Sequence, residues 1–280
     1  MPDQQAITPE EIEAKRDAGE AVAAAAAIMA RLREPGGCPW DREQTFDTIK
    51  RHTLEETYEV FDAIERRAWP DLRDELGDML LQVLFYAQMA SEAGYFTLRD
   101  VAESLNAKLI RRHPHVFGEA LAADANAVLR NWEQIKREEK RAKPAEERHA
   151  SALDSIPRSM PATLEAAKLG SAAAKAGFDW PDAKGLFEKL AEETGELRQE
   201  VEAGEHDLVE AEFGDLLFTM INLARHLGVD AESALRRTNA KFRSRYASME
   251  QLAGGIDHFD GASLEQKEAF WEQAKAGETA

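Results

Sequence analysis

The sequence is poor in cysteine and basic residues, and both shortages exclude classes of protein. Its 280 residues include one cysteine, Cys38, so an internal disulfide and a cysteine-based zinc site are excluded. Lys and Arg number 35 against 53 Asp and Glu, which gives a formal net charge of −18. Because this field repels duplex DNA and anionic lipid, and no block of basic residues offsets it, we expect no nucleic-acid partner and no membrane partner.

The chain also lacks a long apolar run. The most apolar stretch, residues 21–30, lies between Glu20 and Arg31 and is about half as long as a membrane-spanning helix. Acidic residues precede it where a signal peptide carries positive charge. Together with the single cysteine, this predicts a soluble protein of the reducing cytoplasm.

Strand signals are nearly absent. Apolar residues instead recur at spacings of three and four, as at Leu54, Tyr58 and Phe61, a pattern typical of helices. A second apolar pattern follows Pro70, which suits the start of a helix, and stops before Gly94, which suits its end. We therefore expect an all-α fold, and the length allows two domains of about 140 residues each.

The strongest feature is an internal repeat. Five acidic positions recur at a constant displacement of 137 residues: Glu55, Glu56, Glu59, Glu75 and Asp78 return as Glu192, Glu193, Glu196, Glu212 and Asp215. The apolar surroundings return as well, ELGDMLLQV at 75–83 beside EFGDLLFTM at 212–220. We therefore predict a duplicated helical domain, with repeats at 22–140 and 153–275 joined by a charged linker at 141–152. Residues 1–21 form an N-terminal extension in this interpretation, and 276–280 a tail.

The acidic positions are spaced for metal binding. In each repeat EExxE is followed, after fifteen residues, by ExxD, so a helix, a short turn and an antiparallel return would direct four carboxylates at one point. Oxygen ligands alone suit Mg²⁺ or Mn²⁺. The predicted ligands are Glu193, Glu196, Glu212 and Asp215, with Glu192 beside them, and in the first repeat Glu56, Glu59, Glu75 and Asp78. A di-iron centre is the competing interpretation, but its Glu-x-x-His pairs are missing from these segments.

These segments resemble a known family. GCPWDREQTFDTIKRHTLEETYEV (37–60), DLRDELGDMLLQVLFYAQMA (71–90) and RRHPHVF (111–117) are similar to MazG nucleoside triphosphate pyrophosphohydrolases. So are GFDW (177–180), EFGDLLFTMINLARHLG (212–228) and NAKFRSR (239–245), and the resemblance covers both repeats. It implies an all-α homodimer in which helices of both chains complete a four-helix bundle around each site.

The resemblance also implies an activity. It implies Mg²⁺-dependent hydrolysis of nucleoside triphosphates between the α and β phosphates, which yields a monophosphate and pyrophosphate and clears excess or damaged nucleotides. The attacking water would be oriented by Glu192 or Glu193, which the sequence does not distinguish. The alternative is a helical dimer that binds nucleotide or a partner protein as a regulatory module without turnover.

The second repeat is predicted to be the catalytic one. Lys189, Asn222 and Arg225 stand where the first repeat has His52, Phe85 and Gln88. Because triphosphate hydrolysis needs cations that hold phosphate, we assign a catalytic role to Lys189. Glu192 and Glu193, the candidates for orienting the water, are the other predicted catalytic residues. The predicted substrate-binding residues are Lys168, Trp180, Lys189, Asn222, Arg225, Asn239, Lys241 and Arg245. The first repeat keeps its carboxylates, so metal binding, dimerisation and weak activity all remain open for it.

Overall fold

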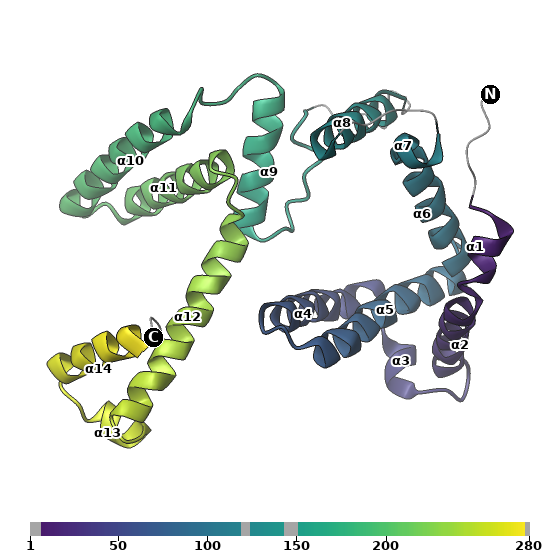
Figure 1. Ribbon diagram of the computed structural model, residues 1–280, viewed down its shortest axis with the longest axis horizontal. Coiled ribbons are helices and arrows are strands. Elements are labelled where there is room, and N and C mark those ends of the chain that lie inside the picture. The colour runs from purple at the N-terminus through teal and green to yellow at the C-terminus, as the bar shows by residue number, and fades with distance from the viewer. Residues whose placement is uncertain (1–6, 119–123, 143–150, 278–280) are drawn as a thin grey trace. The chain divides into compact units, whose positions relative to one another are not determined.

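A computed structural model describes residues 7–118, 124–142 and 151–277, and every regular element in these ranges is an α-helix (Figure 1). The all-α prediction is thereby confirmed. The helices are α1 (Pro9–Glu13), α2 (Arg16–Arg33), α3 (Pro39–Glu43), α4 (Phe46–Glu65), α5 (Trp69–Glu92), α6 (Leu98–Arg112), α7 (Pro114–Phe117), α8 (Ala125–Ala142), α9 (Ala162–Lys175), α10 (Ala183–Ala203), α11 (His206–His226), α12 (Ala231–Leu252), α13 (Ile256–Asp260) and α14 (Leu264–Gly277). None of the described helices is long and apolar enough to cross a membrane.

The chain divides into two compact units, Met1–Arg148 and His149–Ala280. The division falls inside the predicted linker at 141–152, of which residues 143–150 lie outside the described ranges. The exact bounds of the repeats, the N-terminal extension and the tail stay predictions.

Each unit contains one long helical hairpin, α4–α5 in the first and α10–α11 in the second (Figure 1). Thr45 caps α4 by accepting a hydrogen bond from the Thr48 N–H, and Asp182 caps α10 by accepting from the N–H groups of Lys184 and Gly185. A turn of three residues joins α4 to α5, and a turn of two joins α10 to α11. The antiparallel return expected between EExxE and ExxD is therefore confirmed in both repeats.

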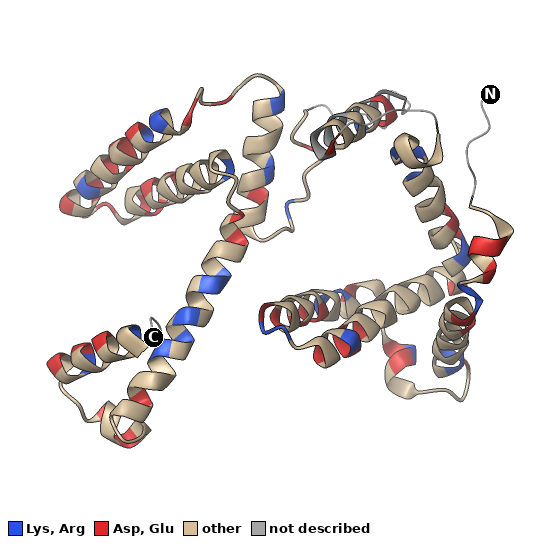
Figure 2. Ribbon diagram, viewed as in Figure 1, with Lys and Arg blue, Asp and Glu red and all other residues tan. Residues whose placement is uncertain are grey.

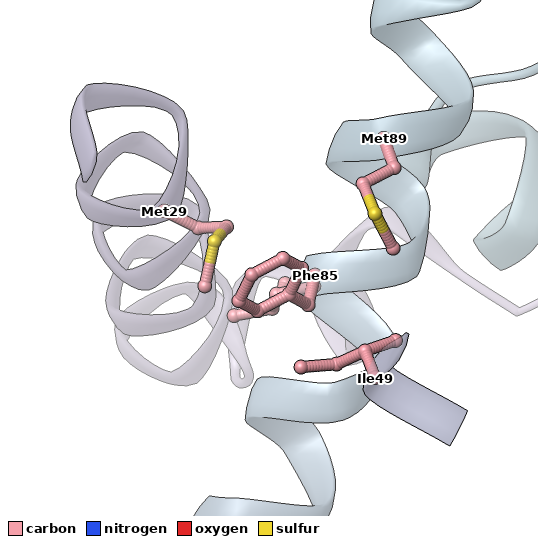
Figure 3. Close-up of a cluster of buried hydrophobic side chains, with 5 residues drawn as sticks. Met29, Ile49, Phe85 and Met89 are labelled. Atoms are coloured by element: carbon pink, nitrogen blue, oxygen red, sulfur yellow. The ribbon is translucent and has the colours of Figure 1, made fainter. Parts of the chain in front are cut away.

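The core of the first unit lies where α2 crosses the hairpin. Met29 of α2, Ile49 of α4, and Leu84, Phe85 and Met89 of α5 are buried together (Figure 3). Burial of each of these side chains contributes roughly 1.5–3 kcal/mol. This cluster packs the end of the hairpin that lies opposite its turn. The half that carries the acidic residues is not part of the cluster.

In the second unit α9 packs against α11 of the hairpin, and α12 begins beside α9 and α11. Gly170 allows the close approach of α9, since a Cβ at this position would lie 2.1 Å from Oδ1 of Asn222 on α11. A separate apolar cluster, formed by Met249, Phe259 and Ala274, holds α12, α13 and α14 together. The start of α12 therefore packs against α9 and α11, whereas its end packs against α13 and α14.

Candidate metal centre

Polar residues form a seam along α11, the most apolar helix of its repeat. They follow one another at alternating spacings of three and four, which places them on one face: Glu212, Asp215, Thr219, Asn222 and His226. Thr219 and Asn222 are buried. A helix normally fills such a seam with apolar side chains, so a polar one at a buried contact points to a function.

Three carboxylates converge where this seam meets α10. Glu193, Glu196 and Glu212 each offer an oxygen, and these oxygens all lie within 4.8 Å of one another. Glu193 is buried, and the pKa of Glu212 is raised by its own desolvation and by repulsion from Glu196 and Glu193. A hard divalent cation relieves this repulsion and prefers oxygen ligands, so the donor set fits Mg²⁺ or Mn²⁺.

The remaining predicted ligands lie at the edge of this group. Asp215 is exposed and is close enough to raise the pKa of Glu212 further, but its oxygen is outside the group of three. Glu192 is also outside the group and is half exposed. Three of the predicted ligands are therefore brought together, and the ligand roles of Asp215 and Glu192 stay predictions.

The first repeat forms a similar group. Oxygens of Glu56, Glu75 and Asp78 lie within 4.8 Å of one another, and Glu59 is close enough to raise the pKa of Glu56. Burial and the neighbouring carboxylates raise the pKa of Glu56 and of Glu75. Both repeats therefore keep the chemistry of a cation site.

Lys189 lies directly beside the carboxylates of the second repeat. Its Nζ is 2.8 Å from Oε1 of Glu193 and 2.9 Å from Oε1 of Glu192, and these two bonds raise the pKa of Lys189. At the equivalent place in the first repeat, Nδ1 of His52 lies 2.7 Å from Oε2 of Glu55. The second repeat therefore places an ammonium where the first has an imidazole.

Asn222 and Arg225 form a second polar group at the other end of the seam. The Nε of Arg225 donates to Oδ1 of Asn222 at 3.2 Å, and Asn222 donates to the Phe218 carbonyl at 3.0 Å. Both η nitrogens of Arg225 donate to the carboxylate of Asp179, in the segment before α10. Arg225 follows Asp215 by ten residues, which is about 15 Å along the helix axis. Its predicted contact with phosphate therefore depends on a substrate that spans this distance.

The other predicted binding residues are scattered. Lys168 is exposed on α9, and Trp180 packs over Gly185 at the start of α10. Asn239 and Lys241 are exposed on α12 and, being two residues apart, lie on opposite faces of that helix. The Lys and Arg residues of α12 lie along its middle part, between Arg236 and Arg245 (Figure 2). The binding roles of these residues stay predictions.

Two contacts of the second unit were not predicted from the sequence. Asp179 lies in the GFDW motif, but its pairing with Arg225 joins residues 46 positions apart. Trp271 of α14 lies under Arg245, whose guanidinium carbon is 5.2 Å from the centre of the indole ring. A tryptophan beside phenylalanine in a C-terminal helix carries no signal of its own, so only the packing of α14 on α12 reveals this contact.

Comparison with known proteins relates the sequence of this chain to one family. The model of the MazG nucleotide pyrophosphohydrolase domain matches residues 44–117 and 182–249, once in each repeat. The nucleoside triphosphate pyrophosphohydrolase of Escherichia coli (strain K12) is 49% identical over 90% of this chain and 95% of its own length. The nucleoside triphosphate pyrophosphohydrolase/pyrophosphatase MazG of Thermotoga maritima is 43% identical over 90% of this chain and 94% of its own. A nucleoside triphosphate pyrophosphohydrolase of Mycolicibacterium smegmatis is 43% identical over 57% of this chain and 48% of its own.

Proposed function

The chain belongs to the MazG nucleotide pyrophosphohydrolase family, and we propose that it hydrolyses nucleoside triphosphates between the α and β phosphates. The observation that carries this proposal is the group of three carboxylates in the second hairpin, with Lys189 held against it. Carboxylates and a neighbouring cation are what a metal-dependent attack on a phosphate needs. The products are a nucleoside monophosphate and pyrophosphate.

The cation of this site is Mg²⁺ in our proposal, with Mn²⁺ as its functional substitute. Glu193, Glu196, Glu212 and Asp215 would hold it, since their oxygens supply hard ligands alone. When bound, the cation makes water a better nucleophile and balances the charge of the leaving pyrophosphate.

The roles of the chain's own residues follow from their positions. Glu192 is half exposed and lies outside the carboxylate group, so it can accept a proton from the attacking water while Glu193 serves as a ligand. Lys189 contacts both glutamates and, on substrate binding, turns its ammonium toward the phosphates. The first repeat offers His52 instead of Lys189 and Phe85 instead of Asn222, so we assign turnover to the second repeat.

We further propose that the protein is a homodimer. Large apolar side chains of both hairpins are about half exposed in the single chain, among them Leu54, Leu76, Phe187, Phe213 and Met220. A second copy would cover these faces and turn each two-helix hairpin into a four-helix bundle. Light scattering coupled to size exclusion should give twice the chain mass. A chain that stays monomeric at micromolar concentrations would contradict this assembly.

The test of the activity is product analysis. The purified protein is incubated with Mg²⁺ and each of a panel of ribo- and deoxyribonucleoside triphosphates, and the products are identified by phosphorus NMR. Monophosphate with pyrophosphate supports the proposal and ranks the substrates. Diphosphate with orthophosphate would show that the wrong phosphorus was chosen. No turnover with any nucleotide would favour a regulatory module that binds without hydrolysis.

A further inference from the structure

We propose that Asp179 is a positioning residue for the metal centre: its ion pair with Arg225 ties the start of α10 to the end of α11 and keeps the carboxylates of the two helices together. The inference rests on the proposed metal-dependent function of this hairpin. Asp179 itself is no ligand, because it pairs with Arg225, which follows Glu212 by thirteen residues, about 20 Å along the helix axis.

The ion pair between Asp179 and Arg225, called the tie below, is bidentate and partly buried. Arg225 donates from Nη1 to Oδ2 of Asp179 at 3.0 Å and from Nη2 to Oδ1 at 2.5 Å, which makes the pair bidentate. His226 adds a contact from Nε2 to Oδ1 at 3.0 Å. Each of the three side chains is less than one quarter exposed, and Arg225 is the main cause of the lowered pKa of Asp179. Partial burial protects this pair from the screening that weakens exposed ion pairs.

Both ends of the tie are fixed to the elements that carry ligands. On the α10 side, the N–H of Trp180 donates to Oδ1 of Asp179, and Asp182 caps α10 only three residues later. On the α11 side, the third contact of Arg225, to buried Asn222, prevents its guanidinium from swinging away. A displacement of Asp179 would therefore move the start of α10, the helix of Glu193 and Glu196.

The hairpin needs such a tie because its acidic half repels itself. Glu193 and Glu196 on α10 face Glu212 on α11, with oxygens within 4.8 Å of one another. Lys189 compensates part of the charge of Glu193, and the repulsion that remains between Glu196 and Glu212 pushes the two helices apart until a cation enters. An attraction between the same two segments at the opposite end of the hairpin opposes this opening and keeps the ligands at binding distance.

The first repeat makes an equivalent tie with different residues. Arg33 of α2 binds Glu92 of α5 and also donates to the backbone carbonyls of Asp41 and Gln44, in the segment before α4. Gln88 stands at the position equivalent to Arg225 and donates to Glu92. In both repeats an arginine and a carboxylate therefore connect the second helix of the hairpin with the segment that precedes its first helix. This recurrence, without identity of residues, indicates that the tie serves the hairpin's acidic site.

The test measures cation binding directly. Mn²⁺ is titrated into the full chain and followed by electron paramagnetic resonance, in a Glu75→Gln background that removes a carboxylate from the first-repeat group. Asp179→Asn keeps the size of the side chain but loses its charge, and we expect the dissociation constant for Mn²⁺ to rise about tenfold, as for other residues behind metal ligands. Asp179→Glu should recover much of the affinity. Glu92→Gln, which cuts the tie of the first repeat, is the matched control and should leave the second-repeat affinity unchanged.

A merely structural role makes a different prediction. It would lower the melting temperature without changing Mn²⁺ affinity in the folded protein, and unchanged affinity in Asp179→Asn would overturn the inference. If that variant does not fold, Arg225→Lys keeps the charge but loses the bidentate contact, and unchanged affinity in it would overturn the inference equally. A parent protein that binds Mn²⁺ but releases no pyrophosphate would end the proposed reaction and leave this inference standing. A parent that binds no Mn²⁺ would end both.

Discussion

Asn222 and Phe85 occupy the same position in the two repeats, 137 residues apart, and both are almost fully buried. Phe85 packs against Met29 and Ile49 in the core of the first unit, with the guanidinium of Arg33 over its ring at 5.3 Å. Asn222 instead accepts a hydrogen bond from Arg225. At the end of the hairpin away from its turn, the first repeat therefore has apolar side chains and the second has polar ones.

This difference separates two hairpins that have the same acidic groups. Carboxylates alone hold a cation, but a triphosphate also needs groups that contact its phosphates and its nucleoside. The second hairpin continues from Glu212 to His226 with polar residues, whereas the first becomes apolar at Phe85 and Met89. We therefore expect the two repeats to differ in substrate binding rather than in cation chemistry.

The first prediction concerns the carboxylates. Glu193→Gln removes a buried charge from the group of three and should lower turnover by about 10²-fold or more, because it loses a predicted metal ligand. Glu56→Gln makes the same change at the equivalent position of the first repeat and should leave turnover close to that of the parent. Steady-state pyrophosphate release decides between them. Equal losses in the two variants would mean that both hairpins are catalytic.

The second prediction concerns the basic residue beside them. Lys189→Ala removes the ammonium that contacts Glu192 and Glu193, and we expect kcat to fall by about 10²-fold as charge on the leaving group is no longer balanced. His52→Ala removes the corresponding group of the first repeat and should have little effect. Both kcat values are measured at saturating Mg²⁺, so that a change in cation affinity does not imitate a change in chemistry. Similar kinetics for the two variants would remove the argument for a catalytic second repeat.

Local sequence rules predicted the hairpins and the acidic groups. EExxE and ExxD place carboxylates on one face of each helix, and the fifteen residues between them accommodate a turn, so their meeting required no knowledge of distant contacts. The backbone of the turn could be predicted in one repeat only. Gly204 has φ of +79°, a value that a glycine in a turn suggests, whereas the equivalent Arg67 has φ of +56°, a value that an arginine does not suggest. The hairpin turn imposes a positive φ on both residues.

Long-range contacts could not be predicted. Asp179 and Arg225 belong to different segments, and their pairing depends on how the loop before α10 folds back on α11. The sequence predicted which apolar residues share a helix face. It did not predict which of these faces are exposed, because exposure depends on the fold of the whole chain.

The third prediction concerns the approach of α9 to α11. Gly170→Ala would place a Cβ 2.1 Å from Oδ1 of Asn222 and 3.2 Å from Nε of Arg225, so one helix must move or the hydrogen bond must break. Such overpacking costs about 1–3 kcal/mol, and it should appear as a lower urea midpoint. Gly19→Ala is the matched control, since nothing lies within 4 Å of its added Cβ. It should raise stability by up to about 1 kcal/mol, because alanine favours helix more than glycine does. Equal effects of the two changes would show that α9 does not approach α11 this closely.

The last prediction concerns acid sensitivity of the α6–α8 contact. Glu139 of α8 accepts hydrogen bonds from Arg112 at 2.6 Å and from Arg111 at 2.7 Å, and these lower its pKa from 4.5 to about 2. Because the pKa is lower in the folded chain, the contact stabilises it fully above pH 4.5 and loses this stabilisation as pH falls from 4.5 toward 2. Solvent exposure of Arg111 limits the contribution to about 1 kcal/mol.

Hydrogen exchange of α8 peptides, compared between the parent and Glu139→Gln, measures this contribution at each pH. The intrinsic pH dependence of exchange cancels, because both proteins are measured under the same conditions. At about pH 7 the variant should exchange faster, since the neutral amide binds the two guanidinium groups less strongly than the carboxylate does. The difference should shrink through about pH 4 and nearly vanish near pH 2, where the parent's own carboxyl is protonated. A difference that stays constant over this range would mean that the charge of Glu139 does not hold α8 against α6.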